Sequence, residues 1–431
     1  MNDSSLGERK PSILVTLILA GETIFFLPFL IARIFRPTML DVFEISNVQL
    51  GSFFSTYGIV AMLSYIFGGP LADKYPSRVL MAIALWLTGI GGFIMAFIPS
   101  PIVMRFVYGF WGFTTIFLFW APMIRSTREW GGSAFQGRAY GWLEGGRGAV
   151  AATLGIISWI LFAWKNAGNT NTPGMSASTE AFQLVVLSIS VITFIIGWLV
   201  WRKIPENRSL MRRESPKRML SKIGQLLKLP GIWAMMFIII CAYAGYKITD
   251  DFSLYAREVF GFSETKASFV GAGALWLRAL VAFSVGFLAD HLVKIRMIAF
   301  FFILSIIAGL IAWAGFLQFS ALLALLNLSF LATGIYGIRA LYFAIQQEAR
   351  IPLPLTGAAV GILSFVGYTP DVFMSPWMGH LLDADPGAGG HQNVFLLLAM
   401  FSLLGLLSTI VFSIFNGKSR RLKSVNEASI L

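Results

Sequence analysis

The chain contains many apolar runs that are each long enough to cross a membrane, and this feature constrains its fold most. A helix that spans a bilayer needs about 20 mostly apolar residues to cover about 30 Å of hydrocarbon. Only 13% of the residues are charged, whereas soluble proteins carry about 25%. A soluble core could not bury this much apolar surface, so the sequence predicts an all-α membrane protein that crosses the bilayer many times.

We predict twelve transmembrane helices in the 431 residues. They are expected at residues 12–34, 48–71, 78–98, 101–124, 138–164, 181–201, 230–256, 265–289, 296–316, 319–344, 354–380 and 392–415. One long polar segment separates the first six spans from the last six. The predicted domains are an N-terminal six-helix bundle at 1–201, a cytoplasmic linker at 202–229, a C-terminal six-helix bundle at 230–416 and a cytoplasmic basic tail at 417–431.

The positions of lysine and arginine predict the orientation, because cytoplasmic loops are enriched in both. If both termini are cytoplasmic, most of the 33 basic residues fall in cytoplasmic segments. The first apolar run is too long for a cleavable signal peptide, so we expect it to be retained as a span. The net charge of +12 is then a topology signal with contact to anionic lipid, and we expect no nucleic-acid partner.

Two polar corners interrupt the apolar pattern at equivalent places, after the second span and after the eighth. The first reads GGPLADKYPSR at 68–78, and the second reads VGFLADHLVKIR at 285–296. The motif G-x-L-A-D therefore occurs twice, with Gly69 and Asp73 each 217 positions before Gly286 and Asp290. This offset indicates an internal duplication of six spans, and parallel repeats of this kind occur in transporters.

In these motifs the chain resembles the major facilitator superfamily, whose second loop carries G-x-L-A-D-[RK]-x-G-[RK]-[RK]. The sequence departs from that pattern at Pro76 and Ser77. The resemblance implies two pseudo-symmetric six-helix bundles around a central cavity and a bacterial-type transporter, which we expect to be a monomer in the inner membrane. It also implies a cytoplasmic gate formed by Gly69, Asp73, Lys74, Arg78, Gly286, Asp290 and Lys294. The alternative for each corner is a tight turn with a capping aspartate.

Ionisable residues within spans are expensive and usually face a cavity or a partner. The sequence places such residues at Glu22, Arg33, Arg105, Glu144, Arg147, Lys247, Asp250, Asp251, Arg278, Arg339, Asp371 and His380. Spans three, six, nine and twelve carry none. The resemblance implies that these four helices pack on the outside of the fold, which agrees with the charge pattern.

Bases outnumber acids near the middle of the membrane, which favours an anionic solute because arginine binds carboxylate, phosphate and sulfonate groups in a fork. We predict substrate binding by Arg278, Arg147, Lys247, Arg339 and Asp371. The alternative is pairing within the protein. Glu144 and Arg147 are three residues apart on one helix, Lys247 stands three and four residues before Asp250 and Asp251, and Arg339 could pair with Glu348 or Asp371.

Two carboxylates are candidates for proton coupling. Burial disfavours the charged form of a carboxylate, so Glu22, which has no basic residue near it in sequence, could bind and release a proton. Asp371 lies beside Pro370 and before Pro376, and these prolines predict a hinge in span eleven.

The sequence therefore predicts secondary transport of a small, anionic organic solute with a proton. Drug or metabolite efflux by proton antiport is an alternative, although span five lacks the proline-containing motif of drug antiporters. A membrane enzyme or a non-transporting sensor is a third possibility. The sequence contains no P-loop and no metal-ligand spacing, so we expect neither ATP hydrolysis nor a cofactor or metal.

Overall fold

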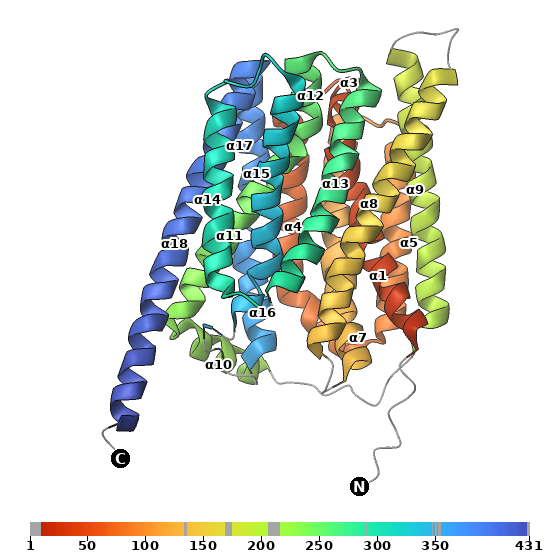
Figure 1. The fold of residues 1–431 in the computed structure, drawn as a ribbon. Coiled ribbons are helices and arrows are strands. Elements are labelled where there is room, and N and C mark those ends of the chain that lie inside the picture. Colours follow the sequence, from red (N-terminus) through yellow and green to blue (C-terminus); the bar gives the residue numbers. More distant parts are fainter. Residues whose placement is uncertain are drawn as a thin grey trace. The chain divides into compact units, whose positions relative to one another are not determined.

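The structure is a computed structural model that describes residues 10–132, 136–168, 175–205, 216–289, 291–346, 348–349, 351 and 355–428. All regular secondary structure in these residues is helical (Figure 1). The predicted all-α class is confirmed.

The first half of the chain supplies six long helices and several short ones. They are α1 (Pro11–Phe25), η1 (Phe26–Leu30), α2 (Ile31–Ile34), α3 (Arg36–Val42), α4 (Asn47–Lys74), α5 (Ser77–Ala96), α6 (Pro101–Gly112), η2 (Phe113–Trp120), α7 (Ala121–Gly131), α8 (Gln136–Gly168) and α9 (Met175–Lys203). A short helix from the polar segment, α10 (Pro216–Leu227), follows.

The second half repeats this pattern. Its helices are α11 (Pro230–Ile248), η3 (Thr249–Asp251), α12 (Phe252–Phe260), α13 (Glu264–Leu288), α14 (Lys294–Trp313), α15 (Ala321–Leu341), η4 (Ala344–Gln346), α16 (Thr356–Gly367), α17 (Pro370–Ala384) and α18 (Ala388–Ala428).

These helices account for the twelve predicted spans. Within the described residues, 11 helical stretches are long and apolar enough to cross a membrane. The 28-residue α4 is not among them, and it occupies the place of the predicted second span. Four of the twelve spans begin at or next to a proline, Pro11, Pro76, Pro101 or Pro230, where the missing N–H of proline leaves no helical hydrogen bond unmade.

Several spans are interrupted. Span one passes through a π-helical turn, η1, which contains Pro28, and span four contains the longer π-helical segment η2. Span seven breaks at η3, and span eleven breaks at Tyr368 and Thr369, just before Pro370. Such π-helical turns widen a helix locally and are frequent at functional sites.

The helices pack as two compact units. The first comprises the described residues of Met1–Arg213 and Asp250–Ala279, and the second those of Glu214–Thr249 and Leu280–Leu431. The unit boundary therefore passes through span seven at Thr249 and through α13 at Ala279. The predicted domains, which are separated by the linker at 202–229, follow the repeat of six spans along the chain. They stay a prediction.

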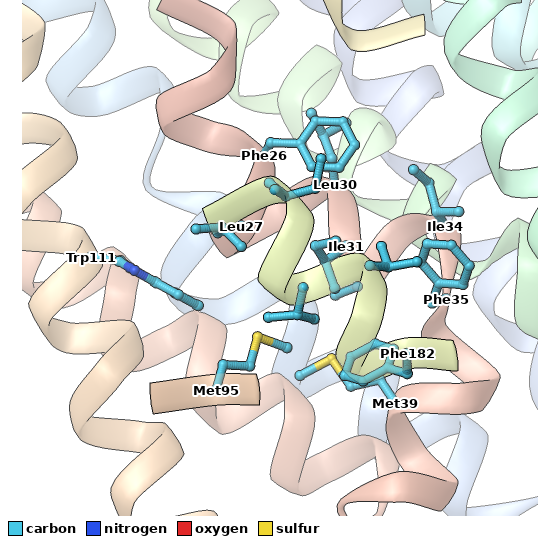
Figure 2. Close-up of a cluster of buried hydrophobic side chains, with 14 of the residues drawn as sticks. Phe26, Leu27, Leu30, Ile31, Ile34, Phe35, Met39, Met95, Trp111 and Phe182 are labelled. Atoms are coloured by element: carbon cyan, nitrogen blue, oxygen red, sulfur yellow. The ribbon is translucent and has the colours of Figure 1, made fainter. Parts of the chain in front are cut away.

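The core of the first unit surrounds span one. Phe26, Ile31, Ile34 and Phe35 are fully buried there, and they pack with side chains from other spans, including Trp111 (Figure 2). In contrast, large apolar side chains such as Phe106 and Phe283 are about three-quarters exposed, at 74% and 75%. Exposed apolar side chains of this size are typical of a surface that contacts a membrane or another protein.

Candidate functional site

Three charged side chains from three spans meet inside the first unit. They are Glu22 on α1, Arg147 on α8 and Arg278 on α13, and we call them the Glu22 triad. Arg278 Nη1 donates a hydrogen bond of 2.9 Å to Glu22 Oε1, and Arg147 Nε lies 3.1 Å from Glu22 Oε2. The exposed fractions of the three residues are 2%, 6% and 6%, so the triad lies out of water.

Further contacts hold Arg147 in position. Its Nε donates to the backbone oxygen of Gly21 at 2.9 Å, and its guanidinium lies 5.6 Å and 5.8 Å from the ring centroids of Phe25 and Trp120. A Cβ at position 21 would lie only 3.3 Å from Arg147 Cδ, so glycine lets the arginine reach the helix backbone. Arg147 Nη1 also donates to Glu144 Oε1 at 2.7 Å, which is the pairing that the sequence offered as the alternative to substrate binding by Arg147.

The triad has an excess of buried positive charge. Two guanidinium groups share the carboxylate of Glu22, while the side chain of Glu144, on the edge of the cluster, is 57% exposed. The sequence suggested that Glu22 is isolated, because no basic residue lies near it in the chain, and Arg278 is 256 residues away. The fold brings them together across two helices.

A second polar cluster lies in the second unit, around Asp371 at the start of α17. Tyr243 donates its hydroxyl hydrogen to the carboxylate of Asp371, at 3.1 Å from Oδ1 and 3.0 Å from Oδ2. Lys247 Nζ lies 3.6 Å from Asp371 Oδ1. Both Tyr243 and Lys247 stand on α11, one turn apart, so that one helix face presents both to the aspartate.

Arg339 lies beside this cluster on α15. Its guanidinium lies 3.8 Å from the ring centroid of Tyr246 and 5.7 Å from that of Tyr243. Tyr336 and Tyr368 extend the aromatic surface, with ring centroids 6.2 Å from Tyr246 and 4.7 Å from Tyr243. Among the described residues, none accepts a hydrogen bond from the buried Nη1 of Arg339, which leaves a donor for an anion or a hydroxyl group.

The remaining predicted charges of span seven belong to another contact of the first unit. Arg33 on α2 binds Asp250 on η3, and both are almost fully buried. Asp251 is fully buried beside it. Arg105 is exposed and donates to Ser52 Oγ at 2.9 Å, so it does not join either cluster.

The residues of the predicted cytoplasmic gate are placed only in part. The side chain of Asp73 and the whole of Asp290 lie outside the described residues. Gly69 lies in the last turns of α4, Lys74 ends that helix with its ammonium 5.3 Å from the Tyr75 ring, and Lys294 begins α14. Arg78 lies 5.1 Å from the ring centroid of Trp201.

No described atom lies within 4 Å of a Cβ built at Gly286. One contact at the first corner was not anticipated. Arg125 on α7 donates to the backbone oxygen of Ala72 at 2.7 Å and to Glu129 at 2.8 Å. It therefore ties α7 to the end of α4, within the G-x-L-A-D motif.

The part of the chain that the structure describes contains no group of three or more His, Cys, Asp or Glu side chains that could hold a metal ion. The two polar clusters combine bases, acids and phenols. This chemistry is suited to reversible binding of charged or hydroxylated solutes.

Comparison with known proteins identifies the family. A family model described as Major Facilitator Superfamily matches residues 13–370. The chain is 28% identical over 396 residues to the inner membrane protein YqcE of Escherichia coli (strain K12), covering 89% of each chain. It is 26% identical over 412 residues to the inner membrane protein YihN of the same organism, covering 94% of this chain and 96% of the other.

Solved structures show the same fold. A bacterial homologue of the human lysosomal transporter Spinster, in an inward-facing and unoccupied conformation, matches with a TM-score of 0.77 at 14% identity. The match covers 95% of this chain and 98% of that structure.

Proposed function

This chain belongs to the major facilitator superfamily and is an integral membrane secondary transporter, and we propose that it carries a small organic anion together with a proton. The observation that supports this proposal is the Glu22 triad, in which two buried guanidinium groups share one buried carboxylate. Secondary transporters bind their solutes near the middle of the membrane. We propose that the triad is a solute site of this kind, suited to an anion.

The chemistry of arginine favours carboxylate, phosphate or sulfonate as the bound group, because the planar guanidinium presents a fork of donors. In the triad, Glu22 already occupies that fork. We propose that the carboxylate of Glu22 stands in for the anion of the solute when no solute is bound.

The exchange of the Glu22 carboxylate for the solute anion couples solute binding to binding of a proton. If a solute anion replaced Glu22 on Arg147 and Arg278 while Glu22 stayed charged, four charges would be buried together, and the Glu22 carboxylate would have lost its guanidinium partners. Burying an uncompensated charge costs several kcal/mol. Protonation of Glu22 avoids this, because one proton and one anion together leave the buried net charge unchanged.

The Asp371 cluster of the second unit is a separate candidate for solute binding. The aromatic faces of Tyr243 and Tyr246 and the free Nη1 of Arg339 suit a hydroxylated body such as that of a sugar acid. Asp371, held by Tyr243 and Lys247, is the second candidate for proton exchange.

The distribution of lysine and arginine supports cytoplasmic termini, and the relatives described as inner membrane proteins support an inner membrane location. In this orientation α10 and the polar corners at 68–78 and 285–296 lie on the cytoplasmic side. The proposed gate on that side consists of Gly69, Asp73, Lys74, Arg78, Gly286, Asp290 and Lys294. We further propose that the protein works as a monomer in contact with anionic lipid.

Uptake into proteoliposomes tests the proposal. The panel contains one hexose body in four charge states, glucose, glucuronate, a hexose phosphate and glucosamine, together with a sulfonate and a lipophilic cation. We expect an imposed inside-alkaline pH gradient to drive accumulation of at least one anion and of neither glucose nor glucosamine. If the lipophilic cation alone were taken up, driven by protons that leave an acidic vesicle interior, the protein would be an efflux antiporter. That result would contradict the proposal.

A further inference from the structure

Arg105 on α6 is an intramembrane charge that neither polar cluster uses. Its side chain is exposed, and its Nη2 donates a hydrogen bond of 2.9 Å to Ser52 Oγ on α4. Among the residues that the structure describes, Arg105 forms no ion pair. The other donors of its guanidinium therefore remain open to a group outside the protein.

The surface around Arg105 is apolar. Ile102 and Phe106, which share its face of α6, are 71% and 74% exposed. On α4, Ile59 lies two turns from Ser52 on the same face and is 50% exposed. Because exposed apolar side chains of this size on a membrane-spanning helix are typical of a surface against lipid, we place the arginine and the serine on the lipid-facing side of the first unit.

The internal repeat supports this placement independently. The positions 217 residues after Ile102, Arg105 and Phe106, at the offset of the two G-x-L-A-D motifs, are Phe319, Leu322 and Leu323. All three are exposed, at 81%, 69% and 41%. The same offset leads from Ser52 to Phe269, which is 49% exposed. At these positions the second copy is apolar, as a face against lipid should be, and the first copy differs from it by one polar pair.

The polar pair stands near the depth of lipid phosphate groups. Arg105 is the fifth residue of α6 and Ser52 the sixth of α4, so at 1.5 Å per residue the pair lies about 6 to 8 Å from the helix starts. The headgroup layer adds about 5 to 8 Å to each side of the hydrocarbon. A long arginine side chain at this depth extends toward the headgroups. In the proposed orientation, these headgroups belong to the non-cytoplasmic leaflet.

We infer that Arg105 and Ser52 form a binding site for the phosphodiester group of a phospholipid. The acyl chains of this lipid lie against Ile59, Ile102 and Phe106. The guanidinium fork matches two oxygens of a phosphate, and the hydrogen bond from Nη2 to Ser52 Oγ fixes the orientation of the fork. The phosphate supplies the counter-ion that Arg105 does not find among the described residues.

Local quenching by lipid tests the site. Cys241→Ala gives a background without thiols, and Phe106→Cys, labelled with a small fluorophore, reports on the lipid beside Arg105. Leu323→Cys is the matched reporter at the equivalent position of the second copy. The full-length protein is placed in vesicles of equal parts phosphatidylcholine and galactosyl diacylglycerol, a lipid without phosphate. Brominated acyl chains, which quench the fluorophore, are carried either by the one lipid or by the other.

At Phe106→Cys we expect brominated phosphatidylcholine to quench about threefold more than the brominated glycolipid, because an exposed charge attracts a lipid phosphate moderately. Arg105→Gln keeps an amide donor but removes the charge, and it should make the two lipids quench equally. Arg105→Lys should retain part of the preference, since an ammonium binds phosphate as a point charge without the fork. At Leu323→Cys the two lipids should quench equally.

Equal quenching by the two lipids at Phe106→Cys, or a preference for phosphatidylcholine that survives Arg105→Gln, would overturn the inference. A preference of the same size at Leu323→Cys would also overturn it, because the equivalent position there carries no arginine. Phosphatidylcholine has no net charge, so the measurement responds to the phosphate and not to a general attraction of anionic lipid. The result does not depend on which solute is carried, since Arg105 lies outside the Glu22 triad.

Discussion

Arg278→Ala is expected to lower affinity for the transported anion by roughly a hundredfold, or about 3 kcal/mol, because it truncates one partner of a buried, hydrogen-bonded charge pair. Arg278 contacts Glu22 directly, and in our proposal the solute anion takes the place of that carboxylate. Arg278→Lys keeps the charge and loses the fork, so we expect an intermediate loss. The measurement is the concentration dependence of initial uptake into proteoliposomes.

Arg105→Ala is the matched control for this series. Arg105 is exposed and belongs to the same unit, so its loss should leave the affinity unchanged. If Arg278→Ala and Arg105→Ala had the same affinity as the parent protein, Arg278 would not be a ligand and the triad would be a structural ion cluster.

Glu22→Gln is expected to reduce accumulation driven by a pH gradient at least about tenfold, since an amide keeps the shape of the carboxyl group and cannot exchange a proton at physiological pH. Arg147 would keep its ion pair with Glu144, and the two guanidinium groups would no longer share a charged Glu22 carboxylate. The anion should therefore still bind, and exchange of labelled for unlabelled anion across the membrane should persist without dependence on pH. Gradient-driven uptake and exchange are measured on the same vesicles.

Glu144→Gln is the control that distinguishes proton coupling by Glu22 from the mere loss of a negative charge beside Arg147. Glu144 binds the same arginine as Glu22 at 2.7 Å, but its side chain is 57% exposed, and partly exposed ion pairs contribute little. We expect about a threefold effect or less on accumulation. Retained pH-driven accumulation in Glu22→Gln would transfer the coupling role to another carboxylate, with Asp371 as the next to be tested.

Local sequence patterns predicted the parts of this protein that depend on neighbours along the chain. Apolar run length predicted the spans, and the predicted and observed ends agree within a few residues except where helices extend into loops. The spacing of Glu144 and Arg147, three residues apart, predicted their ion pair, because such side chains share a helix face.

The contacts that define the site were not predictable in this way. Glu22 and Arg278 are 256 residues apart, and Arg33 and Asp250 are 217 apart. Each pair forms only when two helices from different halves pack together. The repeat offset contained a usable signal for the second pair, since Arg33 and Asp250 have opposite charges at equivalent positions.

The interruptions of the spans were predicted only in part. Prolines at 370 and 376 indicated a hinge in span eleven, and the structure breaks that span before Pro370. Pro28 offered the same signal in span one, where the structure has the η1 turn. The η2 segment of span four contains no proline itself, but Pro122 follows two residues after its end, and this sign was not used.

The central claim is that a solute anion and Glu22 compete for Arg147 and Arg278, with a proton binding as the anion arrives. Proton uptake by the purified protein in weakly buffered solution, recorded while the best-transported anion of the panel is added, tests it most directly. We predict that the parent protein takes up close to one proton per anion bound and that Glu22→Gln takes up none. Anion binding without proton uptake by the parent protein, or equal proton uptake by both proteins, would contradict the account.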